Sequence, residues 1–214
     1  AATKRDVILA AAPDDVLAVL VARSNSQGAG GTVADHRSVT EQPVNTAAAV
    51  HDRRGDFPRA REGLASAIEI LRERFGREDR ALLARALNSL TQLHLREGLL
   101  QEAVATNREA LRTAEETHDP LLVSRALKGL GVLSHRLYYF QNARKCLERS
   151  LEISREIKDR VGAAFSGLLL GECAFTINLL DEASRRADEA GGVAQKLGQA
   201  YLIGRTLLFK GLLA

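Results

Sequence analysis

The sequence predicts an all-α fold, a right-handed α-solenoid of antiparallel helix hairpins with about four repeats and a terminal helix. The first observation behind this prediction is a period of 40 residues, since Asp119 and Ala143 recur as Asp159 and Ala183. The second is composition, because the hydrophobic residues are mostly alanine and leucine and only 4 prolines occur, both of which favour helix. A fixed period of this length indicates stacked helical repeats.

The chain is expected to divide into an N-terminal helical segment (1–23), a flexible linker (24–38) and a helical repeat domain (39–214). Pro13 suits the first position of a helix, and the two aspartates that follow suit its first turn. The run SNSQGAGGT is rich in glycine and serine, which is typical of a flexible linker. The chain contains no methionine, so we expect a processed chain or a fragment of a longer protein.

Apolar residues three to four positions apart predict helices along the repeat domain. The expected first helices of the hairpins are 42–53, 80–97, 120–137 and 160–177, and the expected second helices are 57–74, 100–117, 140–158 and 180–197. The segment 200–213 is expected to be the first helix of a fifth hairpin. Asp79, Asp119 and Asp159 precede helices at positions that suit an N-cap.

The repeat resembles the tetratricopeptide repeat, in a variety with longer helices. That family's pattern has a large residue, then Leu-Gly three and four positions on, then a small residue early in the second helix and another seven positions later. Repeats three and four match it with Leu127, Leu130, Gly131, Ala143 and Ser150, and with Leu170, Gly171, Ala183 and Ala190. Repeat two places Thr91 at the glycine position, and repeat one matches less well. The small residues are expected to let the two helices of a hairpin approach closely.

The resemblance implies a binding face, because in this family the first helices usually line a concave surface that holds a peptide. Carried over by repeat position, the candidate peptide-binding residues are Asn45, Arg53, Arg85, Asn88, Gln92, Arg96, Arg125, Lys128, Arg136, Phe165, Glu172 and Phe175. Arginine and asparagine side chains suit carboxylates and peptide backbone. We therefore expect an acidic peptide or a chain terminus, with an apolar anchor beside Phe165 and Phe175. The alternative is that these charges only keep an exposed helix face soluble.

The segment 200–213 is largely apolar, whereas a solenoid normally ends in a helix with a polar outer face. The candidate interface residues on it are Tyr201, Leu202, Leu208 and Leu212. Two interpretations remain open: the natural chain continues into further repeats, or this surface binds a second copy or another partner.

Composition disfavours several other functions. The net charge of +3 comes from 30 basic and 27 acidic residues, so the surface is mixed and a nucleic-acid partner is not expected. Cys146 and Cys173 have no CxxC spacing and the 5 histidines share no ligand spacing, so we expect no metal site and no cofactor. Cys173 is expected to be a core residue. We find no nucleophile–base pair and no paired catalytic carboxylates, and therefore expect no enzyme.

Two further expectations concern the cellular location of the protein and the turn between two helices of repeat three. No stretch resembles a membrane span, so we expect a cytoplasmic protein that does not enter membranes. The run Tyr138-Tyr139-Phe140 replaces the turn glycine of other repeats and is expected to be a packed hairpin corner rather than a binding patch.

The sequence therefore favours a protein–protein interaction scaffold or regulatory module that binds a peptide or protein segment. The alternative is the sensor region of a larger signalling protein, such as a transcription regulator, ATPase, kinase or protease, whose effector domain lies outside this chain.

Overall fold

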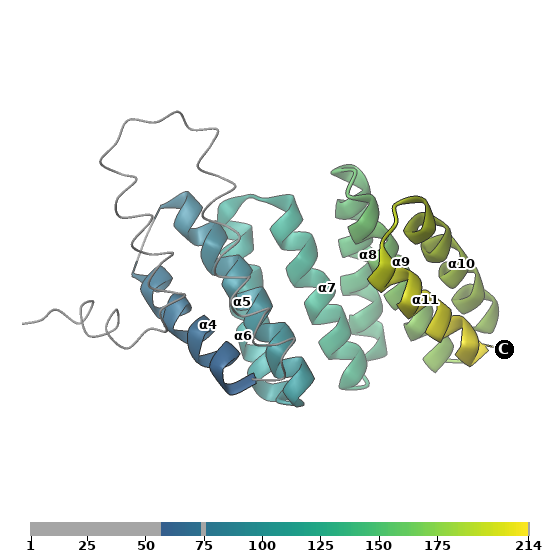
Figure 1. Ribbon diagram of the computed structural model, residues 1–214, viewed down its shortest axis with the longest axis horizontal. Coiled ribbons are helices and arrows are strands. Elements are labelled where there is room, and N and C mark those ends of the chain that lie inside the picture. The colour runs from purple at the N-terminus through teal and green to yellow at the C-terminus, as the bar shows by residue number, and fades with distance from the viewer. Residues whose placement is uncertain (1–56, 74–75, 214) are drawn as a thin grey trace, which may run out of the picture. The chain divides into compact units, whose positions relative to one another are not determined.

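A computed structural model of the chain describes residues 57–73 and 76–213. The regular secondary structure of this part is helical throughout and is labelled α4 to α11 (Figure 1). The chain forms two compact units, which meet in the sequence between Thr117 and His118. The first unit contains α4 (Phe57–Arg72), α5 (Arg77–Glu97) and α6 (Leu100–Thr117). The second contains α7 (Pro120–Arg136), α8 (Phe140–Glu156), α9 (Arg160–Thr176), α10 (Leu180–Lys196) and α11 (Ala200–Leu213).

These helices confirm the all-α prediction, because α5 pairs with α6, α7 with α8 and α9 with α10 as successive antiparallel hairpins. The bounds of α6 and α11 are those predicted, and α4, α7, α8, α9 and α10 end one or two residues early. The predicted segment 1–23, the linker 24–38 and the helix 42–53 lie outside the described residues. The handedness of the array remains a prediction. None of the described helices is both long and apolar enough to cross a membrane.

Aspartate caps begin two helices as expected, and one expectation is wrong. The carboxylate of Asp119 accepts hydrogen bonds from the backbone N–H of Leu121 (2.9 Å) and Leu122 (3.4 Å) at the start of α7. Asp159 accepts from the N–H of Gly162 (2.9 Å) at the start of α9. Asp79 is not a cap, because α5 begins two residues before it and its N-cap is Gly76. Asp79 lies instead in the first turn, where acidic residues complement the helix dipole.

The first unit is held together by leucine and isoleucine side chains between neighbouring helices. Leu64 and Ile68 of α4 belong to one buried cluster with Leu83, Leu87 and Leu93 of α5. Ion pairs supplement this core at its edge: Arg61 of α4 bonds both carboxylate oxygens of Glu97, and Arg72 bonds both carboxylate oxygens of Glu109.

The hairpins of the second unit depend on the small residues of the repeat pattern. A Cβ atom on Gly131 would lie 2.6 Å from Cγ of Leu147 and 3.4 Å from the carbonyl oxygen of Ala143. On Gly171 it would lie 3.3 Å from the carbonyl oxygen of Ala183. The Leu-Gly and Ala positions of repeats three and four therefore bring the paired helices into close contact, as the sequence predicted.

A residue in the left-handed conformation recurs every 20 residues from 98 onward. These residues are Gly98, His118, Tyr138, Lys158, Asn178 and Gly198, with φ between 52° and 77°. After α7, the N–H of Tyr139 donates to the carbonyl of Ser134 (2.8 Å) and the N–H of Tyr138 to that of His135 (3.0 Å). This pair of bonds is the Schellman arrangement, which satisfies the carbonyls at a helix end. Each 40-residue repeat therefore consists of two helix-and-turn units of equal length.

Repeat three contains buried hydroxyl groups at positions that hold alanine in neighbouring repeats. The Oγ atom of Ser124 lies 3.0 Å from that of Ser150 and 2.8 Å from that of Ser154. Ser150 Oγ also donates to the Ser124 carbonyl (2.9 Å) and lies 3.0 Å from Ser166 Oγ. The residues 40 positions before and after the first three are Ala84, Ala110 and Ala114, and Ala164, Ala190 and Ala194. This network joins α7, α8 and α9, and all four side chains are almost fully buried.

Candidate functional site

The predicted peptide-binding residues are distributed over both units. Asn45 and Arg53 lie outside the described residues. In the first unit, Arg85 and Asn88 on α5 are half-buried, whereas Gln92 and Arg96 are exposed. In the second unit, the candidates on α7 are Arg125, Lys128 and Arg136, and those on α9 are Phe165, Glu172 and Phe175.

The structure brings several candidates of the second unit together on one side of α7, α9 and α11, here called the α7–α9–α11 face. The Lys128 ammonium lies over the ring of Phe165, 5.5 Å from its centroid. The Phe165 ring in turn stacks on Tyr201 of α11, with centroids 5.7 Å apart and planes at 22°. A cation over an aromatic ring is attracted by the negative face of the ring. These contacts connect one side chain from each of three successive first helices.

The ammonium group of Lys128 is partly shielded from water. Burial lowers the pKa of its ammonium group, the carboxylate of Asp159 opposes that effect, and the guanidinium of Arg125 adds to it. Lys128 is half-buried and Arg125 is exposed. This end of the α7–α9–α11 face therefore presents two positive groups beside an aromatic stack.

An ion pair links α9 to α11 farther along the same face. Arg205 donates from Nε (3.0 Å) and from Nη2 (2.8 Å) to the two carboxylate oxygens of Glu172. Burial opposes ionisation of Arg205, but the hydrogen bonds and charge of Glu172 outweigh it, so the pKa of the guanidinium is raised. The bidentate geometry is the strong form of this interaction. The candidate carboxylate of Glu172 is therefore neutralised within the chain.

A pocket of about 300 Å³ opens beside this ion pair. Its apolar wall comes from α9 and α11, where Phe175 meets Phe209 edge to face at 5.9 Å and Leu208 and Leu212 complete the surface. Its polar wall comes from His135, Thr176, Glu172 and Arg205. The predicted apolar anchor beside Phe175 thus coincides with a concave site, whereas Phe165 belongs to the aromatic stack.

His135 closes the α7 side of this pocket. Its Nε2 atom lies 2.9 Å from the Thr176 hydroxyl, and its ring is tilted against Phe140 with centroids 5.7 Å apart. Burial lowers the pKa of this imidazole; the carboxylate of Glu172 raises it and Arg136 lowers it further. A neutral imidazole is therefore favoured here, and it can donate or accept one hydrogen bond at each nitrogen according to its tautomer.

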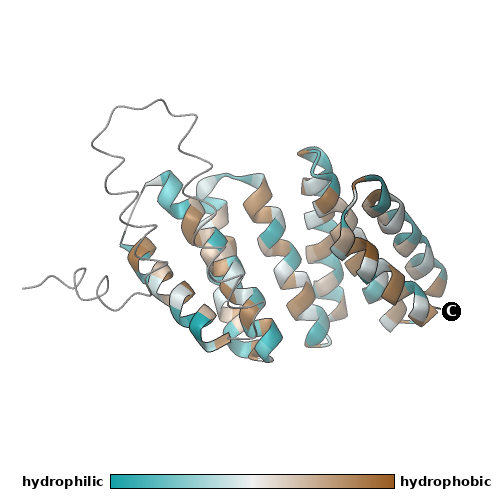
Figure 2. Ribbon diagram, viewed as in Figure 1, coloured by the Kyte–Doolittle hydropathy of each residue, from teal (hydrophilic) through white to brown (hydrophobic). Residues whose placement is uncertain are grey.

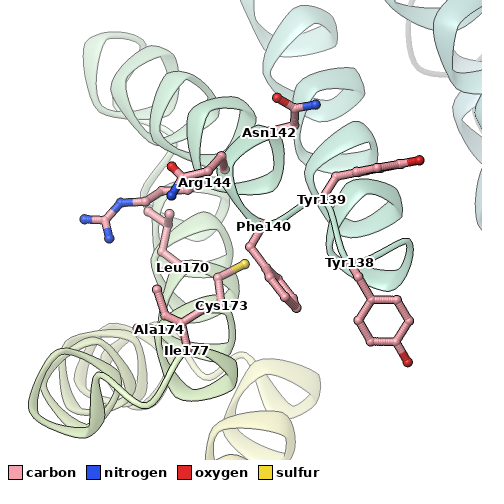
Figure 3. Close-up of a pocket in the computed structure, with 10 residues that line it drawn as sticks. Tyr138, Tyr139, Phe140, Asn142, Arg144, Leu170, Cys173, Ala174 and Ile177 are labelled. Atoms are coloured by element: carbon pink, nitrogen blue, oxygen red, sulfur yellow. The ribbon is translucent and has the colours of Figure 1, made fainter.

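A second, larger pocket of about 580 Å³ lies at the turn between α7 and α8 (Figure 3). Its lining residues come from the turn, the first helical turns of α8 and the end of α9: Tyr138, Tyr139, Phe140, Gln141, Asn142, Arg144, Leu170, Cys173, Ala174 and Ile177. Figure 3 shows Phe140 and Cys173 among the side chains that line the pocket. The site is therefore partly aromatic and partly aliphatic, with amide groups and one arginine at its edge.

The expectation of a packed corner at this turn is wrong for both tyrosines. Tyr138 is 78% exposed and Tyr139 is 62% exposed, and only Phe140 is half-buried. Tyr138 is the left-handed residue of the turn and Tyr139 is the N-cap of α8, so both lie at the end of the hairpin and outside its two helices. Tyr138 still meets Phe140 edge to face, with centroids 6.1 Å apart.

The cysteine in this pocket is a packing residue, as expected. Cys173 is buried, and burial raises the pKa of its thiol to about 11; Glu172 adds to this shift and Arg144 opposes it. Arg144 itself is held by Glu148 (2.9 Å) and lies 3.6 Å from Glu182. No group of three or more His, Cys, Asp and Glu within residues 57–73 and 76–213 could hold a metal ion.

The candidate interface residues on α11 divide into two groups. Tyr201, Leu208 and Leu212 are exposed by 71%, 76% and 69%. Leu202 is only 1% exposed and belongs to the core that α11 forms with α9 and α10, so including it in an exposed interface is wrong. Leu202 points toward the chain because it lies on the same side of the helix as Phe209, which is also buried.

Sequence reasoning missed two features of this unit. It placed Glu172 in a groove but did not pair it with Arg205, because the bidentate contact depends on side-chain geometry that the repeat pattern does not encode. It also missed the turn pocket, for which the only signal was the aromatic run Tyr138-Tyr139-Phe140 at the turn where repeat two has Gly98.

The fold of this chain is similar to the folds of several solved structures. Aspartyl phosphate phosphatase F from Bacillus subtilis matches with a TM-score of 0.69 and 15% identity, over 81% of this chain and 45% of that chain. BtubC (BKLC) from P. vanneervenii matches with a TM-score of 0.73 and 19% identity, over 99% of this chain and 84% of that chain. The apo form of RapI matches with a TM-score of 0.70 and 14% identity, over 92% and 69%.

No protein-family model matches the chain, and no curated protein sequence is significantly similar to it. The chain spans less than half the length of phosphatase F. The likeness is thus one of fold: this chain shares with the three proteins an all-α architecture of successive antiparallel helix pairs.

Proposed function

We propose that the chain is a tetratricopeptide-repeat protein that binds a segment of another protein. Two observations support this assignment. The repeat pattern places glycine and alanine where paired helices approach most closely, at Gly131 with Ala143 and at Gly171 with Ala183. The fold is similar to those of BtubC and RapI, at TM-scores of 0.73 and 0.70.

The α7–α9–α11 face of the second unit is the proposed binding surface, and the observation that carries the proposal is its 300 Å³ pocket, with the positive charges of Arg125 and Lys128 farther along α7. This volume lies at the lower end of the range for ligand pockets, about 300–1,000 Å³. It suits one apolar side chain in contact with Phe175 and Leu208. The neutral His135 can hydrogen-bond the backbone next to that side chain.

The charge of the face favours an acidic partner segment. Glu172 is neutralised by Arg205, so the positive charges of Arg125 and Lys128 on α7 are not balanced by it. Guanidinium and ammonium groups on a binding surface attract carboxylates and speed their association. The proposed ligand is an extended segment with one aromatic or aliphatic anchor for the pocket and acidic residues toward Arg125.

We propose that the module acts by binding and not by catalysis. The Cys173 thiol in the turn pocket has a pKa of about 11, so it is protonated at neutral pH and is a poor nucleophile. The expected cytoplasmic location is part of the same proposal.

Selection from a random peptide library on the immobilised chain tests this function directly. Peptides with an aromatic or aliphatic residue next to acidic residues should be enriched, and their binding should weaken at higher salt because the charge of Arg125 is exposed. Arg125→Glu should reduce binding of the selected peptides by about tenfold, since it replaces an attractive charge with a repulsive one. Leu208→Ser should also weaken them by removing one wall of the pocket.

The matched control is Arg155→Glu, which makes the same charge reversal at an exposed position on α8. It should leave binding unchanged. The proposal fails if the library yields no enriched peptides, or if peptides bind equally well to Arg125→Glu and to Arg155→Glu.

A second candidate is the regulatory region of a larger signalling protein. It is favoured by the match to phosphatase F, of which this chain covers 45%. The sequence of the complete gene decides between the two candidates, because an adjoining effector domain is required by the second and not by the first.

A further inference from the structure

The outward side of α11 is apolar and uncovered among the described residues. Leu207 and Leu208 are exposed by 60% and 76%. Gly204 and Gly211 are also exposed, and a Cβ atom on either would meet nothing within 4 Å. Figure 2 shows hydrophobic residues along much of α11.

The repeat register shows that equivalent positions are covered by a helix elsewhere in the second unit. Leu168, 40 residues before Leu208, is fully buried. Gly171 and Gly131, 40 and 80 residues before Gly211, pack against α10 and α8 so closely that a Cβ atom would meet side-chain carbon at 3.0 Å and 2.6 Å. The outward side of α11 therefore has the pattern of a helix-packing face without a helix on it.

Helical geometry arranges this face around a glycine seam. Gly204 and Gly211 are seven residues apart, which is about two turns, so they lie nearly in line along α11. Leu207 lies on one side of that line and Leu208 on the other, because successive residues are separated by about 100°. The buried side chains of Leu202 and Phe209 are on the opposite side of the helix.

The charged residues of α11 lie at the edges of this face and have partners in their own chain. Arg205 is bound by Glu172 of α9, and Lys210 forms an ion pair with Asp188 of α10. Two copies of the face can therefore meet without placing unpaired like charges opposite each other. Like charges directly opposed would otherwise disfavour self-association.

We propose that the chain forms a homodimer through antiparallel packing of α11 on α11 of a second copy. The pattern is symmetric about the midpoint between Leu207 and Leu208, which is where the two-fold axis of such a pair passes. In that register Gly204 faces the partner's Gly211, Leu208 faces the partner's Leu208, and Tyr201 lies beside the partner's Leu212. A two-fold interface requires this kind of self-complementary surface.

The size of the face determines how tightly two copies are expected to bind. One helix of 14 residues offers less than a standard stable interface, which buries about 1,200–2,000 Å². The dimer should therefore be concentration-dependent, with a dissociation constant on the order of micromolar. Leu208 and Leu212 also line the 300 Å³ pocket, so dimerisation covers one wall of that pocket.

Sedimentation equilibrium of the 214-residue chain, from below about 1 μM to several hundred μM, measures this association. Leu208→Glu should weaken the dimer at least tenfold, since it places two carboxylates against each other at the axis. Leu180→Glu is the matched control, because Leu180 is 49% exposed at the start of α10, outside this face. It should leave the dissociation constant unchanged.

Two glycine variants test the seam itself. Gly204→Leu should abolish close packing of the two helices, whereas Gly192→Leu on α10 should have no effect on association. Both glycines are exposed, and a Cβ atom on either would meet nothing within 4 Å, so neither variant should perturb the monomer. Circular dichroism confirms that each variant remains folded.

Cysteine crosslinking tests the register. Leu208→Cys should give a disulfide-linked dimer under mild oxidation, and Leu180→Cys should not. A chain that stays monomeric over the whole concentration range overturns the proposal, as does an association that survives both Leu208→Glu and Gly204→Leu. Arg125, on which the peptide test depends, lies on α7 outside this interface, so Arg125→Glu should leave the dissociation constant of the dimer unchanged.

Discussion

Gly131 faces Leu147 across the α7–α8 hairpin so closely that a methyl group at position 131 would stand 2.6 Å from Leu147 Cγ. That separation is well inside the contact distance of two carbon atoms, about 3.5–4.0 Å. The equivalent positions in the first unit are Thr91 and Asn107, both fully buried, where the glycine is replaced and the leucine is absent. Close packing in each hairpin therefore depends on which helix contributes the smaller side chain.

Gly131→Ala should destabilise the second unit although alanine is the better helix former. Overpacking costs about 1–3 kcal/mol, and the gain in helix propensity returns about 1 kcal/mol at most. Gly167→Ala is the control: it lies inside α9 with no atom within 4 Å of a new Cβ, and should raise stability. Urea unfolding measures both. Equal stabilisation by the two variants would contradict the close approach.

Replacing the four buried serines together should cost less stability than the sum of the four single replacements. Ser150→Ala deletes the hydroxyl next to Ser124 and Ser166, and leaving buried hydroxyl groups short of a partner costs about 1–3 kcal/mol. Replacing Ser124, Ser150, Ser154 and Ser166 together by alanine leaves no buried hydroxyl in need of a bond. The combined variant should therefore cost less than the sum of the four single variants in thermal unfolding. Simple additivity would argue against a coupled network.

Lys158→Gly should stabilise the protein, because Lys158 has a φ of 59° that glycine adopts without strain. A side chain in the left-handed region costs about 1–2 kcal/mol, and the greater chain entropy of glycine returns part of that gain. We expect a net increase of about 0.5–1 kcal/mol in the free energy of unfolding. Lys145→Gly, at an exposed position inside α8, should instead destabilise by about 1 kcal/mol.

Acid should weaken the fold through two histidines. Burial lowers the pKa of His94 in the first unit and of His135 in the second. Each binds fewer protons when folded than when unfolded, so stability is complete above the unfolded pKa of about 6.5 and falls as the pH drops below it. His135→Gln should therefore lose less thermal stability than the natural sequence between about pH 7 and pH 5. An unchanged pH profile would contradict this account.

The helices could be predicted from the sequence because the 40-residue period fixes their places repeatedly. Asp119 and Asp159 mark helix starts, and the predicted bounds of α6 and α11 agree with the structure. The start of α5 was less predictable, since Asp79 suits both an N-cap and a first turn. The period helps little there, because the spacing from repeat one to repeat two differs from 40 residues.

The sequence predicted which helix face carries the candidate residues, but it did not predict which of their side chains contact one another. Repeat position placed Lys128, Phe165 and Glu172 together, yet it did not indicate that Glu172 binds Arg205 or that Lys128 lies over Phe165. Those contacts depend on rotamers and on which neighbours reach each side chain first. Leu202 was assigned to the wrong side of α11 because an almost wholly apolar helix gives little periodic contrast between its two sides.

The evenly spaced left-handed turns also limit which changes of sequence can alter the surface of the chain. From Gly98 to Gly198 every connection between helices has the same short form, so the chain presents helix sides and tight corners there instead of long loops. Residues inserted at such a corner would disrupt the compact left-handed turn and the hydrogen bonds that satisfy the carbonyls at the helix end. The surface should therefore be easier to alter by exchanging side chains at constant length, and Tyr138, which is 78% exposed at a corner that suits glycine, is one position where a side chain can vary.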